Sequence, residues 1–286
     1  MLDFDVIAAQ SLDHALDVLA SDEDVMVVAG ATDFIPGLRA GVFRPDKVLD
    51  ISGLKELQGI ETVDGGLRMG ALTTHAELAA SPVVKDRAAP LGTAARHIAG
   101  PQVRNRATVG GNLCNTSPAA DTAPALLVLD AEVQLISAEG ERQVSLPEFI
   151  TGPGSTCLRS DELLYGIFVP TPPDGAGAAF KKLGRRRALA CSVVNAAALV
   201  VGSGSDVMEA RLALGAVAPT PVRCRAAETA LTGVTWNASQ TAVAWERVLD
   251  TIDPIDDVRA SGAYRRAAAV ALAKQVTEEA WRARKQ

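Results

Sequence analysis

Two polar segments that contain glycine hold the residues best suited to bind a ligand. The first, AGATDF at residues 29–34, directly follows the apolar run 25–28. Small residues at the end of a strand let a ligand approach the backbone, and consecutive unpaired amides bind an anion such as phosphate. The hydroxyl of Thr32 adds a further donor. A tight turn from a strand into a helix uses the same residue types, so this segment alone favours a plain turn.

The second segment, residues 104–124, is denser in hydrogen-bonding groups. Gly110 and Gly111 permit close approach to the backbone, and Asp121 is placed to accept hydrogen bonds from the hydroxyls of a ribose or ribityl chain. A Cβ atom at Gly111 is then expected to push a ligand away. An ordinary surface loop does not need so many polar side chains, so the pattern favours a bound ligand. Those side chains are Thr108, Asn112, Asn115, Thr116 and Ser117.

Motifs of several other sites are absent from the sequence. No GxGxxG follows the first strand, and no GxxxxGK[ST], HExxH or GxSxG occurs. These absences disfavour a dinucleotide-binding Rossmann fold and P-loop chemistry. The cysteines form no CxxC or CxxH pair, so the sequence gives no support for zinc or iron–sulfur ligation by this chain. They stand at positions 114, 157, 191 and 224.

The composition limits the class of protein. The chain has 286 residues, of which 22% are charged and 48% hydrophobic, and this length allows two domains. A formal net charge of −6 and an aromatic content of 4% argue against a nucleic-acid-binding surface. No apolar run approaches the roughly 18 residues of a membrane span, and no signal peptide is visible. Dispersed cysteines then indicate a reduced, cytoplasmic protein.

Hydrophobic periodicity predicts the elements that position the first segment. Residues 11–20 place apolar side chains on one helical face, with Ser11 as the N-cap. Residues 25–30 are almost wholly apolar, which predicts a strand buried on both faces. Strands are also expected at 47–52 and within 65–72, and helices over 73–99.

The pattern changes around the second segment. Residues 101–112 are polar and irregular, and Pro118 is expected in the first turn of a helix capped by Ser117. A hairpin and a strand follow, and the stretch 171–177, rich in proline and glycine, is expected to be a linker between domains. Beyond it apolar strands come first and helices last, which describes an α+β domain.

The two segments, in this order, resemble the paired motifs of one family. AGATDF is similar to an AGGTDL-type first motif, and TVGGNLCNTSPAAD at 108–121 to a TxGGNxxxxSPxxD-type second motif. Both belong to the FAD-binding (medium) subunits of molybdenum hydroxylases, which include carbon monoxide dehydrogenase and xanthine dehydrogenase. Ala31 stands where the family commonly has glycine. Further similarity at 211–223 and 253–266 extends the resemblance over essentially the whole chain.

The resemblance implies an α+β fold with a vanillyl-alcohol-oxidase-type (PCMH-type) FAD-binding domain at 1–172. Its two lobes would span about 1–55 and 56–172, followed at 177–286 by a C-terminal α+β domain as in carbon monoxide dehydrogenase flavoproteins. The two segments would surround the pyrophosphate, Asp121 would bind sugar hydroxyls, and Lys182, in preference to Lys181, would approach the isoalloxazine. The implied cofactor-binding residues are Val28, Ala29, Gly30, Ala31, Thr32, Asp33, Phe34, Thr108, Val109, Gly110, Gly111, Asn112, Thr116, Asp121 and Lys182.

The family also implies cofactors and partners. The chain would carry FAD and pass electrons from [2Fe-2S] clusters of a small partner subunit to an external acceptor, while a large partner subunit holds molybdopterin. The assembly would be a dimer of heterotrimers. Some oxidases on this scaffold attach FAD through histidine or cysteine, but Cys114 and His97 are expected to be packed side chains, so FAD is expected to be non-covalent. His75, at a helix start, is expected to be solvated or to act as a cap.

Two alternatives remain at this point. A stand-alone flavin-dependent oxidase or reductase could use the same scaffold, although residues 171–286 show no His–Tyr or His–Asp constellation for acid–base work. Turnover of an alcohol, a sugar or NADH by the isolated chain would favour it. A non-catalytic assembly protein that has lost the flavin is the other alternative. Gly30, Gly110, Gly111 and Asp121 are intact, which argues against it.

Overall fold

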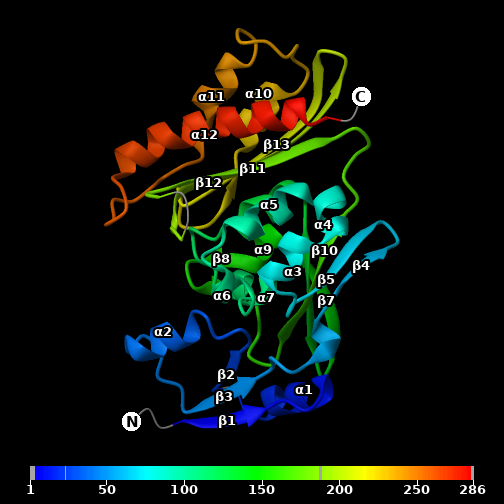
Figure 1. Cartoon of the computed structure of the whole chain (residues 1–286), viewed down its shortest axis with the longest axis vertical. Helices are drawn as coiled ribbons and strands as arrows, with labels where there is room; N and C mark the ends of the chain where they lie inside the picture. Colours follow the sequence, from blue (N-terminus) through cyan, green and yellow to red (C-terminus); the bar gives the residue numbers. More distant parts are fainter. Residues whose placement is uncertain (1–3, 23, 187–188, 285–286) are drawn as a thin grey trace.

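The protein is described by a computed structural model covering residues 4–22, 24–186 and 189–284. Three parts follow one another along the long axis of the molecule (Figure 1). A small sheet near the N-terminus lies at one end, a mixed middle part follows, and the C-terminal sheet with its helices lies at the other end. The outer limits predicted for the two domains, residues 1 and 286, lie outside the described residues.

The first part is a three-stranded parallel sheet in the order β1-β3-β2 with one helix packed on it. Ser11 Oγ accepts the His14 amide, which confirms the predicted N-cap of α1. A strand follows α1 as predicted, but the prediction that it is buried on both faces is wrong. Strand β2 lies at the edge of the sheet, and only its Val28 is buried. The elements are β1 (Asp5–Ala8), α1 (Leu12–Ser21), β2 (Val25–Val28), α2 (Phe34–Arg39), β3 (Lys47–Asp50) and the 3₁₀ helix η1 (Lys55–Leu57).

The middle part is a five-stranded antiparallel sheet in the order β4-β5-β10-β6-β7, covered by short helices. Its apolar core includes Met69, Leu91, Leu126 and Phe149, all fully buried. The elements are β4 (Ile60–Val63), β5 (Gly66–Gly70), α3 (His75–Ala80), α4 (Pro82–Arg87), α5 (Ala89–His97), α6 (Pro101–Arg104), α7 (Val109–Cys114), α8 (Thr122–Val128), β6 (Glu132–Ser137), β7 (Gly140–Ser145), α9 (Leu146–Phe149), β8 (Ile150–Gly152), β9 (Ser155–Thr156) and β10 (Leu163–Pro170).

Two predictions for the middle part are wrong. The stretch expected to be irregular contains helix α6 and the start of α7. Helix α8 begins at Thr122, not at Pro118, because Ser117 forms a turn in which it accepts the amides of Ala119 and Ala120. Serine side chains that bond the backbone two residues on stabilise such turns in place of a helix.

The third part is a four-stranded antiparallel sheet in the order β11-β12-β13-β14, with the long helix α12 across one face (Figure 1). Strands precede helices, as predicted, and the α+β class is confirmed. The elements are β11 (Gly177–Gly184), β12 (Ser192–Ser203), β13 (Asp206–Gly215), β14 (Val222–Arg223), α10 (Arg225–Leu231), α11 (Ala242–Arg247), the 3₁₀ helix η2 (Val248–Asp250) and α12 (Gly262–Arg282).

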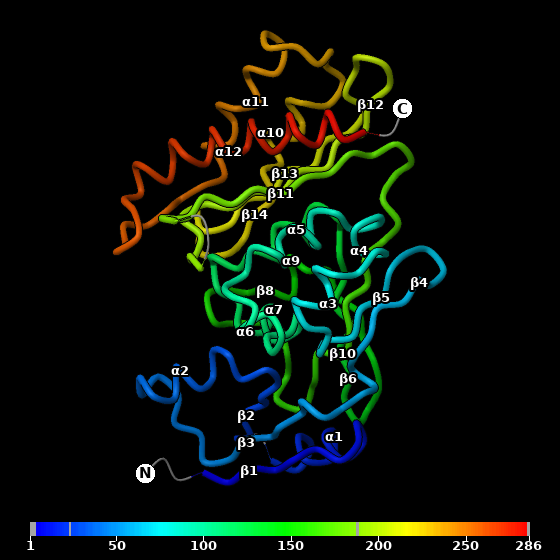
Figure 2. Tube along the Cα trace, viewed as in Figure 1, coloured from blue at the N-terminus to red at the C-terminus, as the bar shows by residue number. Residues whose placement is uncertain are grey.

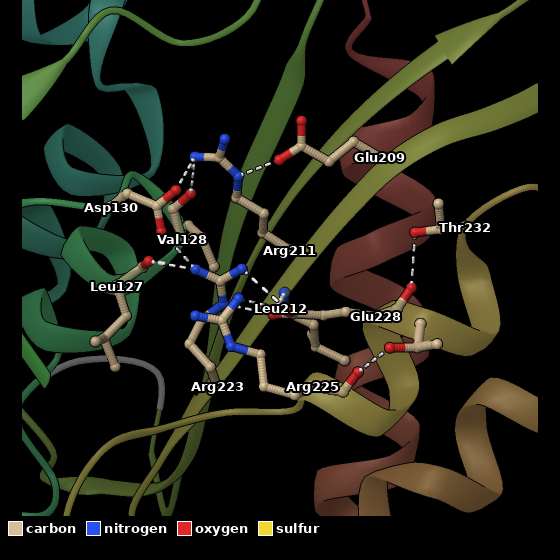
Figure 3. A network of polar contacts seen from close by, with 11 residues as sticks. Leu127, Val128, Asp130, Glu209, Arg211, Leu212, Arg223, Arg225, Glu228 and Thr232 are labelled. Atoms are coloured by element: carbon tan, nitrogen blue, oxygen red, sulfur yellow. Dashed lines mark hydrogen bonds and ion pairs between the residues drawn. The ribbon is translucent and has the colours of Figure 1, made fainter.

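The third part docks on the middle part through both apolar and charged contacts. The chain crosses between them once, from β10 to β11 (Figure 2), while α8 packs against β12 and β13. Arg223 Nη1 donates to the Leu127 carbonyl at 2.9 Å and to Asp130 Oδ1 at 2.8 Å, and Arg211 reaches Asp130 Oδ2 at 2.7 Å (Figure 3). These contacts fix the relative position of the two parts. Among the described residues, no helix is both long and apolar enough to cross a membrane.

Candidate functional site

A cavity of about 850 Å³ lies where the three parts of the molecule meet. Its volume falls within the range of roughly 300–1,000 Å³ typical of small-molecule and cofactor sites. The first part contributes residues 26–34, the middle part contributes most of the remaining wall, and the third part contributes Lys182 and residues 189–192. Much of the wall is apolar, from side chains that include Met26, Phe34, Phe43, Ile98, Val103, Leu158, Leu163, Leu164 and Leu189.

The first polar segment turns sharply from β2 into α2. Ala31 has a φ of +59°, a left-handed conformation that glycine adopts at lower cost. Within the described chain, the backbone amides of Ala31, Thr32, Asp33 and Phe34 donate to no protein acceptor. These four successive amides, unpaired among the described residues, belong to the cavity wall and present hydrogen-bond donors suited to an anion.

The second polar segment begins at the N-terminal turn of α7. Thr108 is the N-cap, and its Oγ1 accepts the Gly111 amide at 3.0 Å. The Gly110 amide donates to the carbonyl of Ala71 at 2.9 Å. Neither glycine amide is therefore free to bind a ligand. What these glycines contribute is the absence of a side chain at a closely packed place. A Cβ at Gly110 would lie 2.7 Å from the Ala71 oxygen.

The two segments touch each other directly. A Cβ atom on Gly30 would lie 2.0 Å from the carbonyl oxygen of Arg106, so only glycine fits where the first segment passes the second. Asn115 Nδ2 also donates to Asp33 Oδ2 at 3.2 Å. Residues far apart in the sequence therefore form one wall of the cavity.

A buried ion pair connects the cavity to the third part. Lys182 Nζ lies 2.5 Å from Asp121 Oδ2 and donates to the His97 carbonyl at 3.2 Å. The other carboxylate oxygen, Oδ1, accepts Ser192 Oγ at 2.6 Å and Asn195 Nδ2 at 2.8 Å. Both oxygens of Asp121 thus already have protein donors, and sugar hydroxyls would have to share them.

The alternation of side chains along β11 separates its two lysines. Lys182 lines the cavity, whereas Lys181 points to the opposite face, where its Nζ pairs with Glu279 Oε2 at 2.7 Å. Of the fifteen cofactor-binding residues implied by the sequence, all but Val109 and Thr116 line the cavity. Val109 is packed in the core of the middle part, and Thr116 is buried with a φ of +41°.

Two titratable side chains in the cavity wall are held neutral. Burial raises the pKa of Cys114 to about 12, so its thiol stays protonated and is a poor nucleophile. Burial, and then the charge of Arg104, lower the pKa of His75 to about 4. The expectation of a solvated or capping His75 is wrong, because the residue is only 1% exposed and Thr74 is the cap of α3.

Sequence comparison agrees with this architecture. The family described as the FAD binding domain in molybdopterin dehydrogenase matches residues 2–172, and that of the CO dehydrogenase flavoprotein C-terminal domain matches residues 178–280. The chain belongs to the FAD-binding subunits of the molybdenum hydroxylases. It is thus an oxidoreductase subunit that binds FAD, and the family resemblance of its sequence is confirmed.

Relatives of this flavoprotein match it over nearly the full length. The xanthine dehydrogenase FAD-binding subunit of Escherichia coli O157:H7 is 36% identical over 274 residues, 95% of this chain and 94% of the relative. The carbon monoxide dehydrogenase structure from Hydrogenophaga pseudoflava superposes with a TM-score of 0.95 at 31% identity, covering 99% of both chains. Quinoline 2-oxidoreductase from Pseudomonas putida 86 gives a TM-score of 0.92 at 30% identity, covering 98% of this chain and 97% of the other.

The residues that line the cavity of this flavoprotein match FAD in charge and polarity. Four amides without partners among the described residues suit the charge of a pyrophosphate, the Lys182 ammonium adds a further donor, and the apolar wall suits an isoalloxazine or adenine ring. The close contact at Gly30 leaves no space for a side chain between the two segments. The donor chemistry and the shape of the cavity therefore agree with the family's cofactor.

Replacing Ala31 with glycine is expected to stabilise the protein. The left-handed φ costs a residue with a Cβ about 1–2 kcal/mol, and the greater freedom of glycine in the unfolded chain offsets about 0.5–1 kcal/mol of this. We expect Ala31→Gly to raise the free energy of unfolding by about 0.5 kcal/mol in urea titrations. Ala29, which has no positive φ, is the control, and Ala29→Gly should be destabilising. A less stable Ala31→Gly protein would contradict the prediction.

The pKa of His75 makes stability depend on pH. Its folded pKa is about 4, whereas the unfolded ring titrates near 6.5. Between these values the unfolded chain binds more protons, so the free energy of unfolding falls as the pH falls from 6.5 to 4. At about 1.4 kcal/mol per pH unit, this loss reaches about 3 kcal/mol. Urea titrations between pH 7 and 4.5 should show the slope, and His75→Leu should lack this part of it.

Proposed function

We propose that this chain is the electron-transfer subunit of a heteromeric molybdenum hydroxylase. It would receive electrons from [2Fe-2S] clusters of a small partner subunit and deliver them to an external acceptor, while a large subunit with molybdopterin oxidises the substrate. The observation that carries the proposal is the cavity itself, which joins both family motifs and closes against the C-terminal domain through Lys182. FAD, when bound, supplies the exchange of one and two electrons that such a junction needs.

The roles of this chain's residues in holding FAD follow from their contacts. The amides of residues 31–34 would bind the pyrophosphate, and Gly30, Gly110 and Gly111 would lie beside it in a wall that packs too closely for larger side chains. Lys182 would approach the isoalloxazine from the third part of the molecule. Asp121 would hold Lys182 in place and share an oxygen with a sugar hydroxyl. The protonated thiol of Cys114 supports a non-covalent FAD.

Within the proposed complex, this chain would have two domains and would assemble with two other subunits. The FAD-binding domain would span 1–172, with lobes at about 1–55 and 56–172, and the C-terminal domain 177–286. The related proteins are named for xanthine, carbon monoxide and quinoline, yet each matches this chain over nearly its full length, which supports a substrate chosen by another subunit. We expect a dimer of heterotrimers in the cytoplasm.

The test compares the isolated chain with the complete complex. The purified chain should contain one FAD released by acid, and neither alcohols, sugars nor NADH should bleach its visible absorbance. In the complex, reducing substrate of the large subunit should bleach the flavin band without added mediators. A colourless chain that takes up no FAD would contradict the proposal. Turnover of alcohol, sugar or NADH by the chain alone would favour the stand-alone oxidase or reductase.

A further inference from the structure

His75 is a buried imidazole whose ring nitrogens have no hydrogen-bond partner in the part of the chain that the structure describes. It lines the cavity, its residue is 1% exposed, and within the described chain neither nitrogen makes a hydrogen bond. Nδ1 is buried without a hydrogen-bond partner among the described residues, and because His75 lines the cavity, Nε2 is the nitrogen available to a ligand there. Nε2 makes no hydrogen bond to the described residues, so a ligand that fills the cavity can supply its partner.

The backbone holds this ring beside the second segment. The amides of Val109 and Gly110 donate to the carbonyls of Thr73 and Ala71, each at 2.9 Å, and the His75 amide donates to Ala107 at 3.0 Å. The position of the ring along the cavity is therefore set by the same contacts that set the start of α7.

The protonation state of the ring determines what it can offer. With a pKa of about 4, the imidazole is neutral at physiological pH and carries a single N–H. A neutral donor can remain buried when the site is empty, whereas a charged one could not. Its natural partner is a group that only accepts hydrogen bonds.

We propose that Nε2–H of His75 donates a hydrogen bond to a pyrophosphate oxygen of FAD. This inference rests on the proposed function, because it assumes that the segments at 29–34 and 108–112 surround the pyrophosphate. His75 belongs to neither segment and supplies a side-chain donor from a third stretch of the chain. It is a binding and positioning residue.

The first experiment measures FAD affinity by quenching of flavin fluorescence. His75→Leu removes the donor and is expected to weaken binding by about tenfold to a hundredfold, the loss of one hydrogen bond to a charged acceptor. His75→Gln, whose Nε2 can replace that of histidine, should restore most of the affinity. His14→Gln is the matched control, because His14 lies on α1 outside the cavity wall. The affinity of this variant for FAD should equal that of the wild type.

The second experiment uses the wild-type chain, so it does not depend on the folding of a variant. Nitrogen-15 NMR of the histidine rings should show a protonated Nε2 in His75 whose resonance moves when FAD is added, and the ³¹P resonances of bound FAD should differ between the wild type and His75→Leu. An unprotonated Nε2, or ring resonances unchanged by FAD, would overturn the proposal while leaving FAD binding intact. A wild-type chain that binds no FAD would instead overturn the proposed function.

Discussion

A Gly30→Ala protein is expected to lose tight FAD binding. The added Cβ would lie 2.0 Å from the Arg106 carbonyl oxygen and 2.7 Å from its carbon, and both are backbone atoms that cannot rotate away. The two segments must then separate, which moves the amides of residues 31–34 relative to Thr108. Losing two hydrogen bonds to a charged group costs about 3–5 kcal/mol. At about 1.4 kcal/mol per tenfold, the dissociation constant for FAD should rise by roughly a hundredfold to several thousandfold.

Gly53 provides the matched control for this substitution. A Cβ there would meet no atom within 4 Å, so Gly53→Ala should bind FAD as the wild type does. The measurement is a titration of each apoprotein with FAD, together with circular dichroism to check that the fold is retained. If a folded Gly30→Ala protein bound FAD with wild-type affinity, the two segments could not be the walls of the FAD site.

Gly30, and not Gly111, is the glycine at which the backbones of the two segments meet, and the sequence could not show this. Motif spacing predicts that both segments bind one ligand, but not which glycine the other segment touches. At Gly111 a Cβ would meet Thr108 Oγ1 at 2.9 Å, a side-chain atom that can give way. The backbone crossing at Gly30 comes from tertiary packing between residues far apart in the chain, which periodicity does not encode.

Other differences between sequence and structure have similar physical causes. The apolar run 25–28 indicates a strand, but its place at the sheet edge depends on which strands pair with it. His75 resembles any polar residue at a helix start until α7 packs beside it and closes the ring off from water. Lys182 could be preferred to Lys181 only by resemblance, whereas the strand alternation of β11 in the structure separates the two.

Lys182→Met is expected to destabilise the protein strongly. Lys182 and Asp121 have side chains that are 8% and 6% exposed, and removing the ammonium leaves the carboxylate buried with only the neutral donors Ser192 and Asn195. Breaking a buried pair on one side costs about 3–5 kcal/mol. The free energy of unfolding of the apoprotein, measured in urea, should fall by about that amount.

Lys181 supplies the matched control on the neighbouring position of the same strand. Its pair with Glu279 is partly exposed, at 33% and 54%, so Lys181→Met should cost at most about 1 kcal/mol. The double variant Lys182→Met with Asp121→Asn removes both charges and should regain most of the stability lost by Lys182→Met, since no uncompensated charge stays buried. Equal losses for the two single lysine variants would show that the Lys182–Asp121 pair is solvated, and that the cavity is open to water where the C-terminal domain meets it.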